Sequence, residues 1–215
     1  DEAAKGLALA AATLAQPKWA ARSGAERGAV LRRWGDLMLV NLEDLACILT
    51  AEQGKPLAEA RAEITYAAGY FHWFAGEAER VYGRTLPVGE GARHWVEQRP
   101  LGVVGLITPW NFPSAMLARK LAAALAAGNG VLAKPALETP LSALALMQLG
   151  ERAGLPKGLV NLILTDDPKA LGAWFCQAPR IAKLSFTGST ETGKWLLSRA
   201  GAGLKPCTME LGGNA

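Results

Sequence analysis

The sequence predicts an α/β protein, with a Rossmann-like parallel sheet, helices on both faces and a helical N-terminal segment before the sheet. From Leu101 onward, short apolar runs alternate with helical stretches, which is the pattern of βαβ units. Before Leu101, apolar residues recur mainly at helical spacing. Connections between parallel strands are almost always right-handed, so helices are expected on both sides of the sheet.

The first part of the chain is expected to be helical. Apolar residues from Val30 to Leu49 share one helical face, and this stretch stops near Gly54–Pro56, where Gly and Pro interrupt helices. A second helix is expected from Leu57 towards Arg80. Glycines and a proline over residues 83–91 predict a loop, and the alternation over His94–Gln98 predicts a strand.

The second part supplies the sheet and its helices. The candidate strands are Val103–Ile107, Val131–Lys134, Val160–Leu164, Ala182–Phe186 and Cys207–Leu211. The candidate helices between them are Ser114–Ala127, Leu141–Ala153, Lys169–Cys176 and Thr190–Ala200.

Composition narrows the function classes. The net charge of +4 comes from scattered Lys and Arg, and no basic run is interleaved with aromatics, so no nucleic-acid partner is expected. Three cysteines without CxxC spacing and only two histidines favour neither a disulfide framework nor a metal site. They suit a reducing compartment, and a cytoplasmic location is expected. No apolar run approaches the roughly 20 residues of a membrane span, so no membrane partner is expected.

The least ordinary residues follow the predicted strands. They are Thr108–Pro113 after the first strand, Lys134–Ala136 after the second, Phe186–Gly193 after the fourth, and Glu210–Asn214 after the last. In an open parallel sheet, ligands bind beyond the carboxyl ends of the strands. The sequence therefore predicts a ligand site at this edge.

Two of these segments suit a phosphorylated ligand. Gly188–Thr190 opens a helix, whose N-terminal N–H groups and dipole favour phosphate, although an ordinary N-cap explains the same residues. Lys134 could donate to ribose or phosphate oxygens, or be a solvated strand-end lysine. No GxGxxG follows the first strand, so the usual Rossmann fingerprint is absent.

Three other residues could carry chemistry. The Asn111 amide could donate to a developing oxyanion, or Asn111 could simply form the turn before Pro113. Glu210 could be a general base in a partly dry cleft, or a surface glutamate. Cys207 has no nearby histidine in sequence and lies within a predicted strand, which favours a buried core thiol over a nucleophile.

Together these segments resemble the aldehyde dehydrogenase superfamily over nearly the whole chain. The matching segments are Glu52–Pro56, Thr108–Pro113, Ala122–Asn129, Lys134-Pro135, Thr139-Pro140, Gly154–Gly158, Phe186–Gly193 and Glu210–Gly213. Each alone is weak evidence, but their order and spacing agree with the family throughout. The resemblance implies an incomplete aldehyde dehydrogenase fold.

The resemblance also implies the cofactor, NAD or NADP, and the roles of individual residues. The residues implied to contact or adjoin the dinucleotide are Thr108, Pro109, Trp110, Asn111, Lys134, Pro135, Ala136, Leu137, Thr187, Gly188, Ser189 and Leu211. Asn111 would hold the aldehyde oxygen as it becomes an oxyanion. Glu210 would activate the water that hydrolyses a thioester formed on a cysteine.

Two positions refine the expected substrate and cofactor. The family commonly has an aromatic residue where this chain has Arg119, whereas enzymes of the succinate-semialdehyde kind show an Arg-Lys pair, and Arg119 could bind the distal carboxylate of a semialdehyde. The ending Gly213–Ala215 also resembles that group. At Leu137 many NAD-preferring relatives have a glutamate that binds ribose hydroxyls, so NADP use stays open.

The expected organisation is one truncated cofactor-binding domain over residues 1–215. It comprises a helical part over 1–92, a strand arm over 93–100 used in oligomerisation, and a βαβ dinucleotide-binding part over 101–215. The family's nucleophilic cysteine lies further along, so this chain alone is expected to be inactive, and the complete protein to be a homo-oligomer. The alternatives are a catalytically inactive nucleotide-binding remnant, a general or glutarate-semialdehyde dehydrogenase, and an unrelated phosphate-binding α/β domain.

Overall fold

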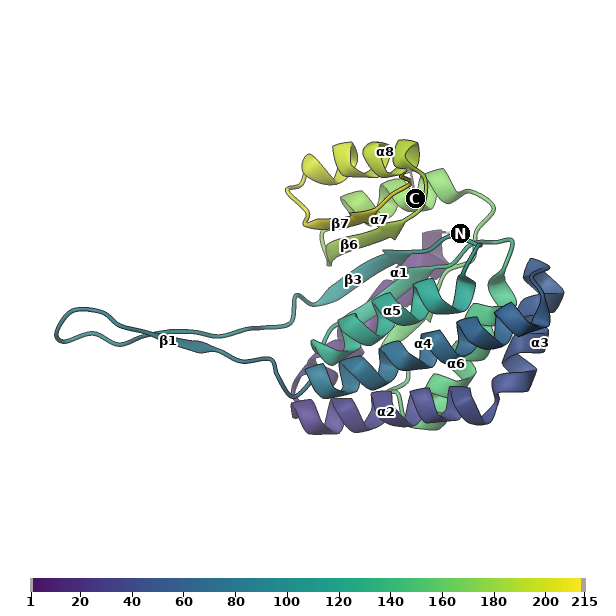
Figure 1. The fold of residues 1–215 in the computed structure, drawn as a ribbon. Coiled ribbons are helices and arrows are strands. Elements are labelled where there is room, and N and C mark those ends of the chain that lie inside the picture. Colours follow the sequence, from purple (N-terminus) through teal and green to yellow (C-terminus); the bar gives the residue numbers. More distant parts are fainter. Residues whose placement is uncertain (1, 214–215) are drawn as a thin grey trace.

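A computed structural model describes residues 2–213 of the chain. Its N-terminal part consists of the helices α1 (Glu2–Ala20), α2 (Gly24–Val40), α3 (Leu42–Gln53) and α4 (Leu57–Glu77) (Figure 1). Asn214 and Ala215, which entered the comparison with the succinate-semialdehyde group, lie outside the described residues.

The helical prediction for this part is confirmed, with one difference. The stretch from Val30 to Leu49 is two helices rather than one, because Asn41 leaves the helical conformation with φ −103° and ψ 26°. Its backbone N–H and its side-chain amide both donate to the Leu37 carbonyl, at 3.1 Å and 2.7 Å. These two bonds satisfy a carbonyl at the end of α2 and let the chain change direction.

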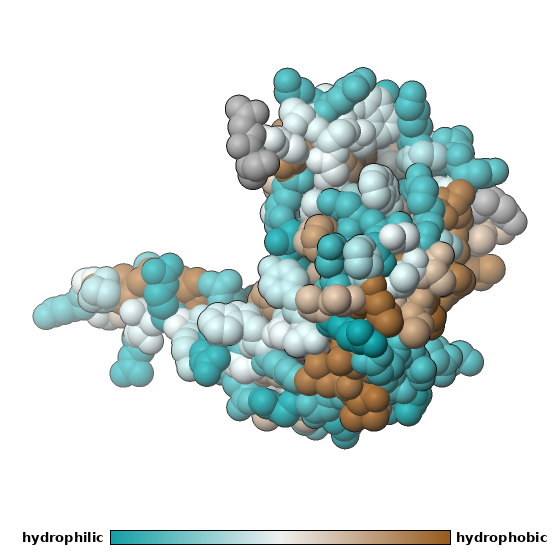
Figure 2. All heavy atoms as spheres, turned by 45° about the vertical axis from the view of Figure 1, so that its right-hand side comes forward, coloured by the Kyte–Doolittle hydropathy of each residue, from teal (hydrophilic) through white to brown (hydrophobic). Residues whose placement is uncertain are grey.

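An arm extends from the body of the molecule (Figure 1). It contains β1 (Arg84–Leu86) and β2 (His94–Val96), which pair antiparallel with Thr85 opposite Trp95. The prediction of a loop over residues 83–91 was therefore wrong at β1, because a strand of three residues carries too little periodicity to be recognised without its partner. Figure 2 shows apolar side chains along this arm. Trp95 is 67% exposed.

The main sheet is parallel, in the order β5-β4-β3-β6-β7. Its strands are β3 (Val103–Ile107), β4 (Gly130–Lys134), β5 (Val160–Leu162), β6 (Ile181–Thr187) and β7 (Cys207–Glu210). Its helices are α5 (Pro113–Ala126), α6 (Pro140–Ala153), α7 (Pro168–Gln177) and α8 (Thr190–Gly201). All five predicted strands and all four predicted helices are present, with ends that differ by a few residues, so the fold prediction is confirmed.

Alternation along the strands builds two cores. Val104 and Leu106 of β3 join the core formed with α2, α4, α5 and α6. Val103 and Ile107 face the other way and join the core formed with α1, α7 and α8. The helical part and the sheet are one packed unit, since the fully buried Trp19 of α1 donates its indole N–H to the Leu125 carbonyl at 2.9 Å.

The two faces of β6 and β7 differ. The side chains towards α7 and α8 are apolar and belong to the second core, such as Leu184 and Phe186. The intervening residues are polar: Lys183 and Ser185 are half-buried, and Thr208 and Glu210 are exposed. This half of the sheet therefore presents a polar surface beside α5.

Over the part of the chain that the structure describes, no helix is both long and apolar enough to cross a membrane.

Candidate active site

The first part of the site is a cavity of about 540 Å³ at the carboxyl ends of β3, β4 and β6, beside α7 and α8. Most residues predicted to bind a dinucleotide line it: Thr108, Pro109, Trp110, Lys134, Ala136, Thr187, Gly188 and Ser189. Asn111, Pro135, Leu137 and Leu211 are not among its lining residues. A cavity is thus present at the carboxyl-end edge of the sheet, where the sequence predicted a ligand site.

Polar groups in this cavity lack partners. The buried hydroxyl oxygens of Thr108 and Thr187 make no hydrogen bond within the described residues. A buried hydroxyl without a partner costs about 1–3 kcal/mol, so both suit a polar ligand that would satisfy them. Burial lowers the pKa of the Lys134 ammonium, and the nearby Glu138 carboxylate opposes this effect. Lys134 and two threonines with unpaired hydroxyls thus line the same cavity.

The N-terminus of α8 borders the cavity. The Ser189 hydroxyl accepts a hydrogen bond from the Thr192 N–H at 3.2 Å, so Ser189 is an ordinary N-cap as well as a lining residue. The Gly188 N–H donates to the Glu210 carbonyl at 3.1 Å. A Cβ at Gly188 would lie 2.5 Å from the Phe186 ring, so glycine is required there for close packing.

Lining residues that the sequence did not single out are also present. They are Glu138, Lys169, Glu191 and Trp195 among others. Glu191 lies within the segment Phe186–Gly193 and Glu138 lies near a strand end, whereas Lys169 and Trp195 lie in predicted helices and carried no signal. The helix dipole and two lysines favour anionic groups of a ligand, whereas Glu138 and Glu191 suit hydroxyl groups.

The second part of the site is a cavity of about 320 Å³ on the polar face of β6 and β7. Arg119 and Glu210, which were predicted to bind substrate and to act as general base, both line it. Nη2 of Arg119 donates to Oε2 of Glu210, and the two side chains are 28% and 45% exposed. Nε of Arg119 is buried and has no partner among residues 2–213. The guanidinium of this lining residue thus retains a donor without a partner.

Lys120 also lines this cavity, and in the sequence it is marked only as the lysine of the Arg-Lys pair. It is 7% exposed, and Nζ donates to the Ser185 hydroxyl at 2.9 Å. The pKa of Lys120 is lowered to about 8, mainly by burial; Glu210 opposes this effect, and Arg119 and Lys183 add to it. Three cationic residues, Arg119, Lys120 and Lys183, line this cavity with one carboxylate, that of Glu210, so the cavity suits an anionic ligand.

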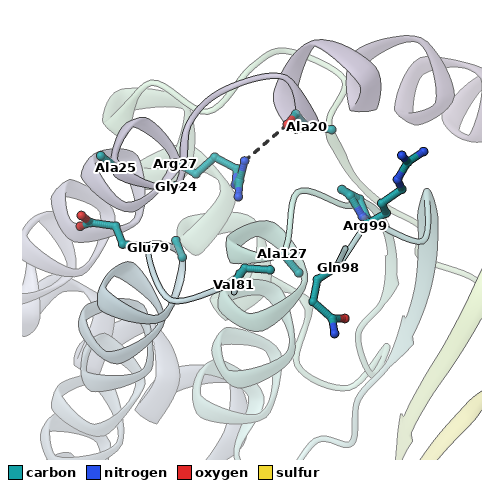
Figure 3. A pocket seen from close by; sticks show the side chains of 11 residues that line it. Ala20, Gly24, Ala25, Arg27, Glu79, Val81, Gln98, Arg99 and Ala127 are labelled. Atoms are coloured by element: carbon teal, nitrogen blue, oxygen red, sulfur yellow. Dashed lines mark hydrogen bonds between the residues drawn. The ribbon is translucent and has the colours of Figure 1, made fainter. Parts of the chain in front are cut away.

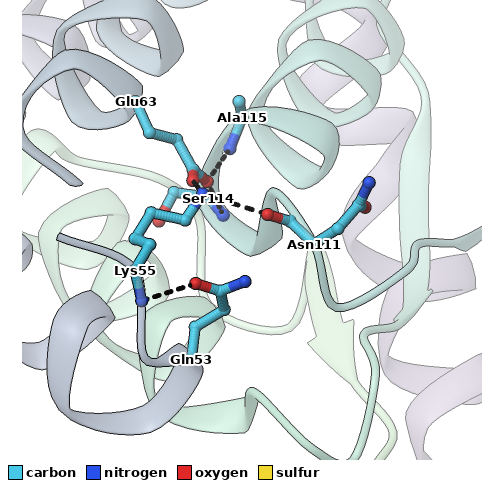
Figure 4. Close-up of polar contacts among 6 residues, drawn as sticks. All are labelled: Gln53, Lys55, Glu63, Asn111, Ser114 and Ala115. Atoms are coloured by element: carbon cyan, nitrogen blue, oxygen red, sulfur yellow. Dashed lines mark hydrogen bonds and ion pairs between the residues drawn. The ribbon is translucent and has the colours of Figure 1, made fainter. Parts of the chain in front are cut away.

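Asn111, which was predicted to hold the aldehyde oxygen, lines neither cavity. It is exposed, and its backbone carbonyl accepts a hydrogen bond from Nζ of Lys55 at 3.0 Å. In Figure 4 the Asn111 carbonyl points towards Lys55 and the side-chain amide points away from it. The Asn111 side-chain amide therefore takes no part in the contact with Lys55.

None of the three cysteines lines either cavity. Cys47 is exposed on α3 and Cys176 is buried in α7. Cys207 is only half-buried, so the prediction of a buried core thiol was too strong. Burial raises its pKa, and its side chain packs with the second core, on the sheet face opposite to Glu210. Its position as the first residue of β7, at the end of the strand, explains the incomplete cover.

Another cavity, of about 510 Å³, lies at the base of the arm (Figure 3). Its one buried charged residue is Arg27, whose guanidinium donates to the carbonyls of Ala126 and Ala20 at 3.0 Å and 3.5 Å. No residue predicted to bind substrate or cofactor lines it. Elsewhere in the described chain, no group of three or more His, Cys, Asp or Glu could hold a metal ion.

Comparison with known proteins agrees with this geometry. The family model "Aldehyde dehydrogenase family" matches residues 1–215. A glutarate-semialdehyde dehydrogenase from Pseudomonas aeruginosa is 50% identical over 97% of this chain and 43% of its own length. An NADP-dependent succinate-semialdehyde dehydrogenase from Escherichia coli is 47% identical with the same coverage.

A solved structure gives the same relationship in three dimensions. The succinate-semialdehyde dehydrogenase from Burkholderia pseudomallei superimposes with a TM-score of 0.94 and 52% identity, over 97% of this chain and 43% of that one. The chain thus spans less than half the length of these relatives. On the matched family model, the sequence identity and the fold, the chain belongs to the aldehyde dehydrogenase family.

Proposed function

We propose that residues 1–215 form the cofactor-binding part of an NAD(P)-dependent aldehyde dehydrogenase that oxidises a short carboxylated semialdehyde. The observation that carries this proposal is the position of Arg119, with an unpaired buried Nε, beside Glu210 in one cavity. A guanidinium can bind a carboxylate through two N–H groups. A second carboxylate, on the substrate, could therefore be held close to Glu210.

The larger cavity is proposed to bind the dinucleotide. Lys134 and the N-terminus of α8 would contact its phosphate or ribose groups, and the Thr108 and Thr187 hydroxyls would gain partners. The bound nicotinamide would accept hydride from the substrate. Leu137 is 46% exposed and carries no charge to repel a 2′-phosphate, so use of NADP as well as NAD is proposed.

Three side chains are proposed to act on the substrate. The Asn111 amide would donate to the aldehyde oxygen as negative charge develops on it. Glu210 would accept a proton from water during hydrolysis of the acyl group. Arg119 would bind the far carboxylate, which would require the guanidinium to turn from Glu210 or to use its remaining donors.

Succinate semialdehyde is our first candidate for the substrate and glutarate semialdehyde the second. Relatives named for each are similarly close, at 47% and 50% identity. A cytoplasmic location and assembly of the complete protein into a homo-oligomer through the arm remain predictions.

The isolated 215-residue chain is proposed to be inactive. None of its three cysteines lines either cavity, and burial raises the pKa of both Cys176 and Cys207, which disfavours their thiolates. The purified chain, assayed with succinate semialdehyde and either cofactor, should give no rate above the blank. Turnover abolished by Cys207→Ala would contradict this.

The decisive experiment on substrate class uses Arg119→Ala in the enzyme that contains this chain. Loss of a partly desolvated charge pair costs about 2–5 kcal/mol, so kcat/KM for succinate semialdehyde should fall by a factor of roughly thirty to several thousand. Butanal, which has no far carboxylate, should be affected little. Arg119→Lys should recover only part of the loss, because an ammonium cannot make the planar two-pronged contact.

The matched control is Arg61→Ala. Arg61 also pairs with a carboxylate, that of Glu43, but the pair is exposed and lies on α4 and α3. This change should leave kcat/KM for both aldehydes within about twofold, since exposed pairs contribute little. Equal losses on succinate semialdehyde and butanal in Arg119→Ala would overturn the semialdehyde assignment.

A further inference from the structure

We propose that Lys55 and Glu63 form a positioning pair for Asn111. Their buried ion pair holds the Asn111 carbonyl and the first turn of α5, and thereby directs the Asn111 side-chain amide. The inference rests on the proposed role of Asn111 at the aldehyde oxygen.

Glu63 holds the first turn of α5. It lies in α4, its side chain is 0% exposed, and Oε1 accepts from the backbone N–H groups of Ser114 and Ala115 at 2.9 Å and 3.1 Å. Phe112, the N-cap of α5, makes no side-chain capping bond. A carboxylate from another helix therefore caps α5, as Figure 4 shows.

Lys55 connects this carboxylate to Asn111. Nζ of Lys55 donates to Oε2 of Glu63 at 2.5 Å and to the Asn111 carbonyl at 3.0 Å. The ammonium also lies 4.0 Å from the centroid of the Phe112 ring. Carboxylate, carbonyl and ring thus surround the cation and connect α4 to residues 111–112.

The connection between α3 and α4 places Lys55 itself. Gly54 ends α3 with φ +87°, a left-handed conformation that favours glycine. The Lys55 N–H then donates to Oε1 of Gln53 at 2.9 Å, and α4 starts two residues later at Leu57. The lysine side chain is therefore directed inward by a defined turn.

The molecule contains a second remote cap for comparison, made by a carboxylate that reaches solvent. Glu52 caps α6 by accepting from the N–H groups of Leu141 and Ser142 at 2.7 Å and 2.8 Å, and no ion-pair partner for Glu52 is found in residues 2–213. Glu52 is only half-buried, whereas the Glu63 side chain is 0% exposed and would be an unpaired buried charge without Lys55. Burying an ion pair costs desolvation energy that a simpler cap avoids. The additional contact that Lys55 makes is the one to the Asn111 carbonyl.

The carbonyl and the side chain of Asn111 share one Cα atom. Fixing the carbonyl therefore limits rotation of the turn and the directions in which the amide can point. Displacing a reacting group by about 1 Å can cost about 100-fold in rate. Loss of the Lys55 contact should act on kcat for the aldehyde and leave the KM for the dinucleotide unchanged.

The test variant is the double replacement Lys55→Met with Glu63→Gln. It removes both charges together, so no unpaired buried charge remains, and the glutamine oxygen can still accept from the α5 N–H groups. We expect kcat/KM to fall about 10- to 100-fold. In the background Asn111→Ala, the same double replacement should cost less than about twofold, because coupled residues are not additive.

A second readout does not depend on activity. Amide hydrogen exchange of the peptide spanning residues 108–118 should become faster in the double replacement. Unchanged exchange would overturn the positioning role, as would an equal loss of rate with and without Asn111. Faster exchange together with full activity of Asn111→Ala would support the positioning and refute the proposed oxyanion role, which separates the two ideas.

Two further variants guard against a general structural effect. Lys55→Arg keeps a cation and its donors and should restore most of the lost rate. Lys205→Met is the matched control, because Nζ of Lys205 also donates to two carbonyls, those of Phe175 and Ala178, at 2.6 Å and 2.8 Å. It should lower Tm with kcat/KM unchanged; a loss of rate equal to that of the Lys55 variant would overturn the proposal.

Discussion

Replacing Lys120 by methionine should stabilise the protein at neutral pH, although it removes a hydrogen bond. Lys120 is 7% exposed, and burial lowers the pKa of its ammonium to about 8 from the ordinary 10.5. Below pH 8 the ammonium is charged in both the folded and the unfolded state, and folding carries the full cost of burying it. Methionine has a similar length and no charge.

The size of the effect follows from the two pKa values. A difference of about 2.5 in pKa corresponds to about 3 kcal/mol of lost stability. The hydrogen bond from Lys120 to Ser185 contributes about 1 kcal/mol in the other direction. Lys120→Met should therefore raise the free energy of unfolding by about 2 kcal/mol at pH 7.

The sign of the pH dependence is specific. Between pH 8 and 10.5 the unfolded state binds more protons at Lys120 than the folded state does, so the wild type gains stability as pH rises. Above pH 10.5 the penalty is gone, and the variant should be less stable by about 1 kcal/mol. The difference between variant and wild type thus changes by about 3 kcal/mol across this window.

Urea unfolding of both proteins at pH 7, 9 and 10.5 measures this difference. Lys134 and Lys205 also have pKa values lowered by burial, but their contributions cancel when the two proteins are compared at the same pH. A stability difference that is constant from pH 7 to 10.5 would refute the reasoning. It would mean that Lys120 is solvated in the folded protein.

Three other predictions concern separate parts of the fold. Leu137→Glu should lower kcat/KM for NADP relative to NAD by about tenfold or more, since the new carboxylate would repel a 2′-phosphate; an unchanged ratio would assign the choice to another residue. Gly150→Ala should destabilise by about 1–3 kcal/mol, because its Cβ would lie 2.7 Å from the Trp34 ring, whereas Gly69→Ala meets nothing within 4 Å and should be neutral or stabilising by thermal melts. Cys176, whose pKa is raised by burial, should resist iodoacetamide at pH 7.5 until urea unfolds the protein, as peptide mass spectrometry would show.

The sheet and its ligand edge could be predicted from sequence because both depend on local patterns. Val103–Ile107 is an apolar run followed by turn residues, and β6 alternates apolar and polar residues before its own turn. Parallel strands place all their carboxyl ends at one edge, so residues as distant as Thr108 and Ser189 were expected together and do line one cavity. Hydrophobic periodicity and parallel-sheet topology were sufficient to predict the sheet and its ligand edge.

Pairings between distant segments could not be predicted in this way. Arg119 and Glu210 were each singled out, but their contact joins residues 91 apart through the relative positions of α5 and β7. Lys55 belongs to a segment that matches the family, but no sequence feature marks Glu63, since a glutamate within a helix ordinarily faces solvent. Its burial depends on the packing of α4 against α5, which no local pattern encodes.

The two remote caps bear on the order in which the helices can form. The starts of α2, α7 and α8 are capped from within their own segments, by Ser23, Asp167 and Ser189. The starts of α5 and α6 depend on Glu63 and Glu52, which lie about fifty and ninety residues upstream. Their first turns gain these hydrogen bonds only after α3 and α4 have docked. Helix formation at these two ends is therefore coupled to tertiary assembly, so α5 and α6 should consolidate late along the folding pathway, when the loop that separates each cap from its helix has closed.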